Sequence, residues 1–175
     1  MLSNHRTPIT GPGLKLHSRS FPFALEQAIA KCKDRIYFCC YVLTGNENRK
    51  SDPVISILEK LKRLQEKNKV DVRFAIDLPR KKTNNWNCNH RFMRYLRDAG
   101  IPFRCSPNKG TLHAKLILID STHVFVGSHN MAMSSFWNPL ELTVEITDSD
   151  FINKCAADYS AWWKTLIVPI CKSGG

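Results

Sequence analysis

A histidine and a lysine interrupt an apolar stretch in the second half of the chain. They are His113 and Lys115 in TLHAKLILID, which covers residues 111–120 and otherwise has the composition of a buried strand. Because side chains two positions apart share one face of a strand, this spacing places an imidazole beside an ammonium group. Two such groups repel each other when both are charged and lose hydration when buried, and an anion would relieve both costs. The apolar residues 116–119 predict a central strand that holds this pair rigidly.

A second polar cluster, Gly127-Ser-His-Asn130, follows the next expected strand. Ser128 and Asn130 again stand two apart, so their hydroxyl and amide groups could hold phosphate oxygens. Gly127 has no side chain and would let a ligand approach the backbone closely. Gly, Ser and Asn are also common turn residues, so the tetrapeptide alone equally fits an ordinary turn. For Asp120, at the end of its strand, we expect a structural role as a turn cap or in a local ion pair.

Together these residues resemble the motif of the phospholipase D superfamily, which is His-x-Lys, four residues and Asp, followed by Gly-Ser-x-Asn. The order of expected strands and helices from about Phe21 to Ile167 also resembles one half of such a protein. The resemblance implies that the catalytic residues are His113, Lys115, Asn130 and Glu141. It implies that the phosphate-binding residues are Lys115, Ser128 and Asn130, and that Asp120 and Gly127 support the motif.

The motif occurs once in this chain, whereas the double-displacement chemistry of the family uses two histidines. The resemblance is therefore to short single-motif nucleases, in which two chains share one active site. It implies a homodimer in which one His113 forms a phosphohistidine and His113 of the partner subunit acts as acid and base. Glu141 would hydrogen-bond a histidine ring, although a solvent-facing strand glutamate is the alternative. No metal and no other cofactor is expected.

Two neighbouring ionisable residues are kept outside the catalytic set. His129 occupies the variable position of the motif. Glu145 follows the ordinary alternation of the expected strand 140–146.

The charge of the chain favours a polyanionic partner. Lysine and arginine number 26 against 15 acidic residues, which gives a net charge of +11. A basic loop with Arg80, Lys81, Lys82 and Trp86 follows an expected strand and is a candidate nucleic-acid contact, with a solvated charge run as the equal alternative. Taken with this charge, the resemblance implies a metal-independent phosphodiesterase, above all an endonuclease that cleaves single-stranded DNA or RNA, with double-stranded nucleic acid left open. The alternatives are a phospholipid phosphodiesterase of the cardiolipin type at a membrane surface and an inactive nucleic-acid-binding module.

Hydrophobic periodicity predicts an α/β fold with a mixed, largely parallel central sheet and helices on both faces. Residues 1–20 are expected to be a flexible basic lead-in and residues 21–175 a single catalytic domain. The expected strands are 35–43, 70–77, 101–105, 111–120, 124–126 and 140–146, and the expected helices are 21–33, 54–64, 89–99 and 151–167. Strands 111–120 and 124–126 are expected to form a hairpin.

Cysteine usage and hydropathy limit the environment of the chain. The seven cysteines are odd in number and scattered, without a C-x-x-C pair, which argues against a disulfide framework or a zinc ribbon. Cys88 and His90 form too small a set for a metal site. We expect a cytoplasmic or other reducing compartment. No apolar run approaches the roughly 20 residues of a membrane helix and no signal-peptide core is present, so the sequence as given predicts a soluble chain, with a membrane anchor outside it left open.

Overall fold

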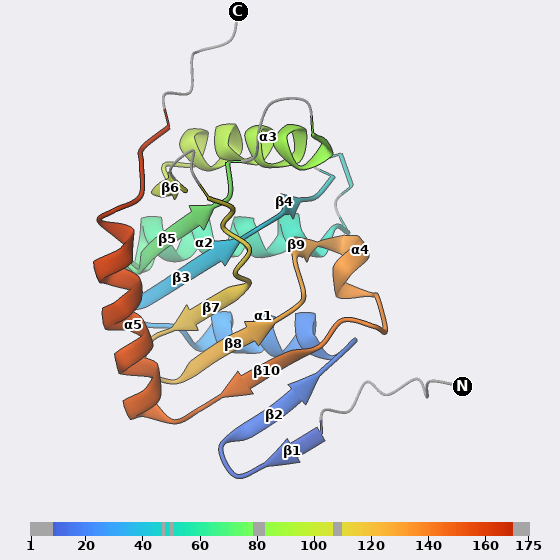
Figure 1. Cartoon of the computed structure of the whole chain (residues 1–175), viewed down its shortest axis with the longest axis vertical. Coiled ribbons are helices and arrows are strands. Elements are labelled where there is room, and N and C mark those ends of the chain that lie inside the picture. The colour runs from blue at the N-terminus through green and yellow to red at the C-terminus, as the bar shows by residue number, and fades with distance from the viewer. Residues whose placement is uncertain (1–8, 47, 50, 79–82, 107–109, 170–175) are drawn as a thin grey trace, which may run out of the picture.

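A mixed eight-stranded sheet forms the centre of the molecule in the computed structural model (Figure 1). The structure describes residues 9–46, 48–49, 51–78, 83–106 and 110–169. The strands of this sheet, in spatial order, are β1 (Ile9–Gly11), β2 (Leu14–His17), β10 (Thr143–Ile146), β8 (His123–Gly127), β7 (Leu116–Ile119), β3 (Arg35–Cys40), β5 (Asp71–Ile76) and β6 (Phe103–Cys105). A second, two-stranded sheet pairs β4 (Leu43–Thr44) with β9 (Met131–Ala132).

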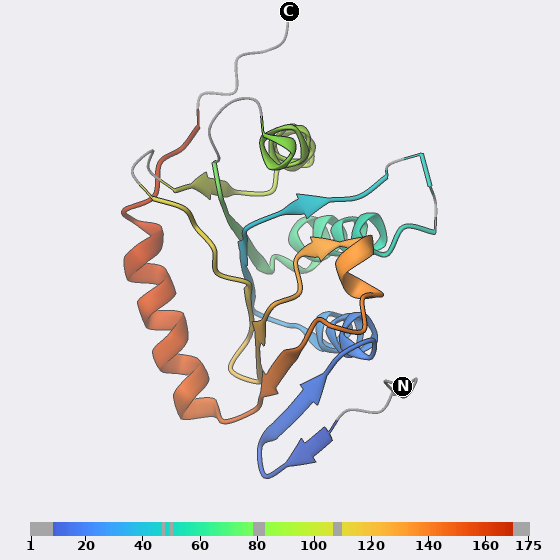
Figure 2. The same cartoon turned by 45° about the vertical axis from the view of Figure 1, so that its right-hand side comes forward.

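Helices cover both faces of the large sheet, as the sequence predicts. The helices are α1 (Phe21–Lys31), α2 (Pro53–Asn68), α3 (Asn84–Asp98), α4 (Met133–Phe136) and α5 (Ser149–Trp163). Figure 2 shows α5 on one side of the sheet and α1 and α2 on the other. One core cluster joins α1, α2 and α3 to the sheet, and a smaller one joins Tyr159 and Trp163 of α5 to the opposite face. Trp163 is thus a core residue.

The pairing of the strands corrects one expectation. The sheet is mixed, but within its described strands parallel pairing is confined to β3 with β5 and β5 with β6. Strands β7, β8, β10, β2 and β1 follow one another as antiparallel neighbours. The expected hairpin of β7 and β8 is confirmed, and β7 also pairs antiparallel with β3. Two of these pairs, β7 with β8 and β1 with β2, are joined by short connections, and a hairpin needs only a tight turn whereas a parallel neighbour needs a crossover.

Residues 9–17 differ from the expected irregular lead-in. They form the hairpin β1–β2, which turns at Gly13 with a φ of +66° and extends the sheet beside β10. The segment is too short and polar to show a period, and its partner strand lies more than a hundred residues away. Only tertiary pairing gives it regular structure.

Several helix ends have a local chemical cause. The Asp52 carboxylate accepts hydrogen bonds from the backbone of Val54 and Ile55 and begins α2. Thr83 caps α3, which begins five residues before the expected start, and Gly100, with a φ of +69°, follows its end as predicted. Among the described residues, no helix is both long enough and apolar enough to cross a bilayer.

Candidate active site

His113 and Lys115 lie side by side in the extended segment that leads into β7. The regular strand begins at Leu116, one residue later than Lys115, but the Gly127 N–H still donates to the Lys115 carbonyl at 3.2 Å. The Lys115 ammonium lies 3.1 Å from His113 Nε2 and donates to the His113 carbonyl at 2.8 Å. The predicted pairing of the two side chains is therefore present, just outside the strand itself.

The aromatic ring of Tyr41 completes the immediate surroundings of this pair. Its ring meets the His113 ring edge-on at a centroid separation of 4.4 Å, and the Lys115 ammonium lies 4.7 Å from its centre. Partial burial lowers the pKa of Lys115, and the negative charge of Glu141 acts in the opposite direction. His113 itself is exposed, so its ring can meet a large substrate or another subunit.

A buried carboxylate that the sequence analysis did not single out holds the segment before His113. Asp77, at the carboxyl end of β5, accepts the Leu112 N–H at 2.7 Å and the Ser106 hydroxyl at 3.3 Å. Burial raises the pKa of Asp77, while these two hydrogen bonds and the nearby His113 lower it. Its place at the carboxyl end of a parallel strand, where open α/β sheets keep their sites, was the available signal.

Asn89 of α3 hydrogen-bonds to the backbone just after β3, just after β5 and at the start of β4. Its amide group donates to the Tyr41 and Asp77 carbonyls at 2.9 Å each, and its oxygen accepts the Leu43 N–H at 2.9 Å. The side chain is fully buried, so these bonds are shielded from water. Sequence reasoning placed Asn89 only at the start of a helix.

Gly127 packs so closely against the start of β10 that a side chain would not fit at this position. A Cβ atom there would lie 2.2 Å from the Leu142 carbonyl oxygen and 2.5 Å from the Thr143 Cα. The expected free space for a ligand is therefore occupied by the chain that enters β10. Ser128 bonds to the same chain, since its Oγ accepts the Leu142 N–H at 3.0 Å and donates to the Leu142 carbonyl at 3.3 Å.

Ser135 forms hydrogen bonds with the two remaining candidate residues, Asn130 and Glu141. Its Oγ accepts the Asn130 N–H at 2.9 Å and donates to Glu141 Oε1 at 3.2 Å. Glu141 lies before β10, in the loop that returns from α4, and not in a strand as expected. The Asn130 Oδ1 atom is buried without a hydrogen-bond partner in the described part of the chain. A donor from a substrate or another subunit would satisfy it.

His129 points into the core beneath this cluster. Its Nδ1 lies 2.8 Å from the Thr143 hydroxyl, and its ring packs 4.6 Å from that of Phe21. Burial lowers the pKa of His129 to about 4, so the ring is neutral at pH 7. This structural position fits its exclusion from the catalytic set.

Asp120 fastens the end of β7 to the start of β3. Its carboxylate accepts the backbone N–H groups of Lys33, Asp34 and Arg35 at 2.9 Å each and the thiol of Cys32 at 3.3 Å. Burial alone would raise the pKa of Asp120, but these donors hold it below its usual value. The carboxylate thus binds a distant segment, in place of the expected cap or ion pair within its own turn.

The expected nucleic-acid contacts are only partly described. Arg80, Lys81 and Lys82 lie outside the described residues, and Trp86 stacks on His90 of α3 at a centroid distance of 4.7 Å. The six cysteines in the described part of the chain form no disulfide with one another. In the same part, no three His, Cys, Asp or Glu side chains are grouped so as to hold a metal ion.

The arrangement supplies the parts of a nucleophilic phosphate site. With the ring proton on Nδ1, Nε2 accepts a hydrogen bond from the Lys115 ammonium, and its lone pair becomes available for attack once an incoming phosphate draws the ammonium to itself. Lys115 and Asn130 can then stabilise the negative oxygens of the phosphate. In the described part of the chain one histidine is paired with a lysine in this way, so the site offers one nucleophile or one acid, not both.

Comparison with solved structures shows proteins of similar fold. The fold is similar to that of Nuc, a phospholipase D family member from Salmonella typhimurium, with a TM-score of 0.65 and 22% identity over 91% of this chain and 97% of that one. It is also similar to NucT from Helicobacter pylori, with a TM-score of 0.67 and 15% identity over 88% and 97% of the two chains. Both likenesses concern the fold.

The sequence comparisons found one matching family model and several relatives named as cardiolipin synthases. Cardiolipin synthase A from Buchnera aphidicola subsp. Acyrthosiphon pisum is 32% identical over 96 residues, which cover 45% of this chain and 20% of that protein. The chain therefore spans about a fifth of the length of this curated relative. The family model described as "Cardiolipin synthase, PLD-like domain" matches residues 25–163. The chain belongs to this family, and with it to the phospholipase D superfamily.

Proposed function

We propose that the chain is a metal-independent phosphodiesterase that cleaves nucleic acid, single-stranded above all, at an active site shared by two copies. The observation that carries the proposal is the exposed His113 ring with Lys115 at 3.1 Å from its Nε2 atom. A nucleophile and a cation placed together at an open surface match the two needs of phosphoryl transfer, attack on phosphorus and stabilisation of its oxygens.

The reaction follows as two displacements. Nε2 of one His113 attacks phosphorus, a phosphorus–nitrogen bond forms, and the bond to the leaving oxygen breaks as His113 of the partner subunit gives that oxygen a proton. The second histidine then takes a proton from water, whose oxygen attacks phosphorus and breaks the phosphorus–nitrogen bond. A phosphate monoester leaves, and both rings return to their starting protonation states.

The remaining site residues stabilise the negative charge of the phosphoryl group or position the histidine rings. Lys115, Asn130 and Ser128 stabilise the phosphoryl oxygens, with the Lys115 pKa lowered by burial but its charge favoured by Glu141. Glu141 bonds to Ser135 at 3.2 Å within this chain, and it is proposed to orient a histidine ring once two chains combine. Asp77 and Tyr41 position His113.

An apolar surface beside the site supports pairing with a second chain. The loop between Asn130 and β10 exposes 43% of Trp137, 73% of Leu140 and 49% of Leu142. An apolar surface next to an incomplete site is suited to burial against a second copy. The net charge of +11 supports nucleic acid as the polyanion that enters the shared site.

A phospholipid substrate is the second candidate. It is favoured by the likeness to proteins named cardiolipin synthases and by the same exposed Leu140 and Trp137, which could contact lipid. A binding module without activity is the third candidate, and it requires the intact His113 and Lys115 pair to be unused.

Cleavage assays separate the three candidates. Labelled single- and double-stranded DNA and RNA and anionic phospholipid vesicles are incubated with wild type and His113→Asn in excess EDTA. We expect nucleic-acid cleavage by wild type and its loss in the variant, by at least about a thousandfold as for removal of a catalytic group. Turnover of lipid alone would select the second candidate, and binding of nucleic acid without cleavage the third. A strict requirement for Mg²⁺ would contradict the mechanism.

A further inference from the structure

A polar pocket separate from the candidate active site lies between α1 and the strands β2, β8 and β10. Its volume is about 390 Å³, and its polar lining includes Lys15, His17, Gln27, Lys31, His123 and Glu145. None of the residues proposed for catalysis lines it. His123 stands at the opposite end of β8 from Gly127, and the Phe21 and Phe125 rings pack between the pocket and His129. The pocket is therefore distinct from the candidate active site.

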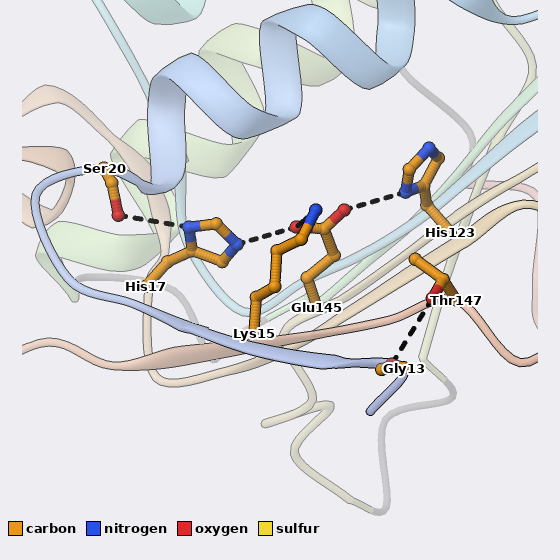
Figure 3. Close-up of polar contacts among 7 residues, drawn as sticks. All are labelled: Gly13, Lys15, His17, Ser20, His123, Glu145 and Thr147. Carbon is orange, nitrogen blue, oxygen red and sulfur yellow. Dashed lines mark hydrogen bonds and ion pairs between the residues drawn. The ribbon is translucent and has the colours of Figure 1, made fainter. Parts of the chain in front are cut away.

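The lining of this pocket includes a buried carboxylate, that of Glu145, whose partners are drawn in Figure 3. Glu145 is 4% exposed and accepts hydrogen bonds from His17 Nε2 at 2.8 Å and His123 Nδ1 at 2.9 Å. Lys15 Nζ lies 3.6 Å from the same carboxylate. The bonds from His123 and His17 hold the pKa of Glu145 well below its usual value, so the carboxylate stays charged and its oxygens are occupied.

Hydrogen-bond donors remain for a ligand once Glu145 is satisfied. The second nitrogen of His17 lies 3.1 Å from Ser20 Oγ. The second nitrogen of His123 points away from Glu145 (Figure 3) and donates to a ligand when the ring is protonated, since Nδ1 already donates to Glu145. Lys15 is partly exposed, and Lys31 and Gln27 approach from α1. Two lysines against one glutamate leave the lining at +1 with both histidines neutral, and protonation of either ring adds to this charge.

The size and the rim of the pocket limit the ligand class. A volume of about 390 Å³ lies at the lower end of the usual range for small-molecule sites, so it suits a nucleotide-sized molecule or the end of a strand. The Phe23 ring also lines the pocket and is 47% exposed, which offers an apolar surface to a flat organic group. Because the lining is positively charged, we expect the same molecule to carry an anionic group as well.

We propose that this pocket binds a phosphate monoester, with Lys15, Lys31 and His123 holding the phosphate and Phe23 contacting the organic part. Free mononucleotides and the terminal phosphate of a nucleic-acid strand share this chemistry. The inference does not rest on the proposed nuclease activity, because none of its residues takes part in that reaction.

Binding is measured by NMR of the histidine side chains in the whole chain carrying His113→Asn and Lys115→Gln, so that these groups neither react nor hold phosphate. The probes are adenosine 5′-monophosphate, inorganic phosphate, a 5′-phosphorylated oligonucleotide and, as the control without phosphate, adenosine. Lys15→Gln with Lys31→Gln removes the two pocket lysines. Lys154→Gln with Lys164→Gln removes the same charge from exposed positions on or next to α5, on the other face of the sheet.

We expect adenosine 5′-monophosphate to shift the His17 and His123 resonances saturably, and adenosine to leave them unchanged. The pocket variant should weaken binding about tenfold or more, whereas the α5 variant should not. The same shifts with the oligonucleotide would identify strand ends as a source of the ligand, and shifts with the mononucleotide alone would identify free nucleotides. Absence of saturable shifts at millimolar phosphate monoester, equal binding of adenosine, or equal weakening by both double variants would overturn the proposal.

Discussion

The reactivity of His113 depends on the few side chains that touch or position it. Tyr41 packs against its ring, Lys115 approaches its Nε2, and Asp77 holds the preceding peptide through the Leu112 N–H. These contacts fix the imidazole before any substrate arrives, which lowers the entropy that must be lost in the reaction. Ser128 and Asn130 depend in turn on Gly127, the residue that lets their segment lie against the chain entering β10.

Replacing Gly127 by alanine tests this close approach. The new Cβ would meet backbone atoms of Leu142 and Thr143, which cannot rotate away, so we expect a loss of about 1–3 kcal/mol in the free energy of unfolding. Urea denaturation measures the loss. Gly11→Ala is the matched control, because a Cβ there meets no atom within 4 Å. Equal stability of Gly127→Ala and wild type would show that β10 can move aside.

The spacing of the motif predicted the pair of His113 and Lys115, but not its supporting residues. Period-two alternation brings two positions onto one face without any knowledge of the fold. Ser135 and Asn89 act through tertiary contacts, and nothing in their local sequence distinguishes them from ordinary helix residues. Asp77 offered one signal, its place at the end of a parallel strand. Asp120 was correctly given a structural role, but its partners, the N–H groups of residues 33–35, lie some 85 positions away.

At the scale of elements, the hairpin β1–β2 is joined to the sheet by side chains as well as by backbone pairing. His17 of β2 and His123 of β8 both bond to Glu145 of β10, and Thr147 bonds to Gly13 at the turn of the hairpin. His17 and Glu145 are 128 residues apart in sequence. Strand alternation placed Glu145 on one face but could not show that this face is buried by α1. The hairpin β1–β2 was therefore not predicted from the sequence.

Glu145→Gln tests whether the carboxylate stabilises this junction. His17 and His123 bond to different oxygens of Glu145, and glutamine replaces one of these oxygens with an NH2 group that cannot accept. We therefore expect a loss of about 1.5–3 kcal/mol in unfolding free energy at pH 7. Because the folded-state pKa of Glu145 lies below its unfolded value of 4.5, its contribution is complete above that value and is lost as the pH falls below it.

Urea titrations of wild type and Glu145→Gln across pH 7 to 3 check both parts of this prediction. The difference in stability between the two proteins should shrink as the pH falls below 4.5. Glu66→Gln, on the exposed side of α2, serves as the control and should match wild type throughout. A constant difference across the range would mean that the charge of Glu145 does not contribute.

At the scale of the whole molecule, one chain is half of the proposed active site. The single motif leaves His113 exposed, the Asn130 oxygen without a partner in the described part of the chain, and Leu140 and Trp137 in contact with solvent. A second copy would cover these groups together. The single motif allowed this prediction from the sequence, whereas the apolar surface beside the site became visible only in the fold.

Sedimentation equilibrium tests the pairing. We expect wild type to sediment at twice the chain mass of 20.0 kDa. Leu140→Asp should shift the protein towards the monomer and lower activity in proportion, because a buried unpaired charge opposes association. Phe151→Asp, at an exposed apolar position on α5, should leave both unchanged. A fully active monomer would refute the shared site.

The central claim is that His113 forms a covalent bond to phosphorus, and trapping this intermediate tests it most directly. Wild type is mixed with a substrate labelled at the scissile phosphate, quenched in alkali, in which phosphohistidine persists, and digested for mass spectrometry. We expect a phosphoryl adduct on His113 that forms and decays at rates compatible with turnover and is absent from His113→Asn. Turnover without an adduct, or an adduct on another residue, would contradict it.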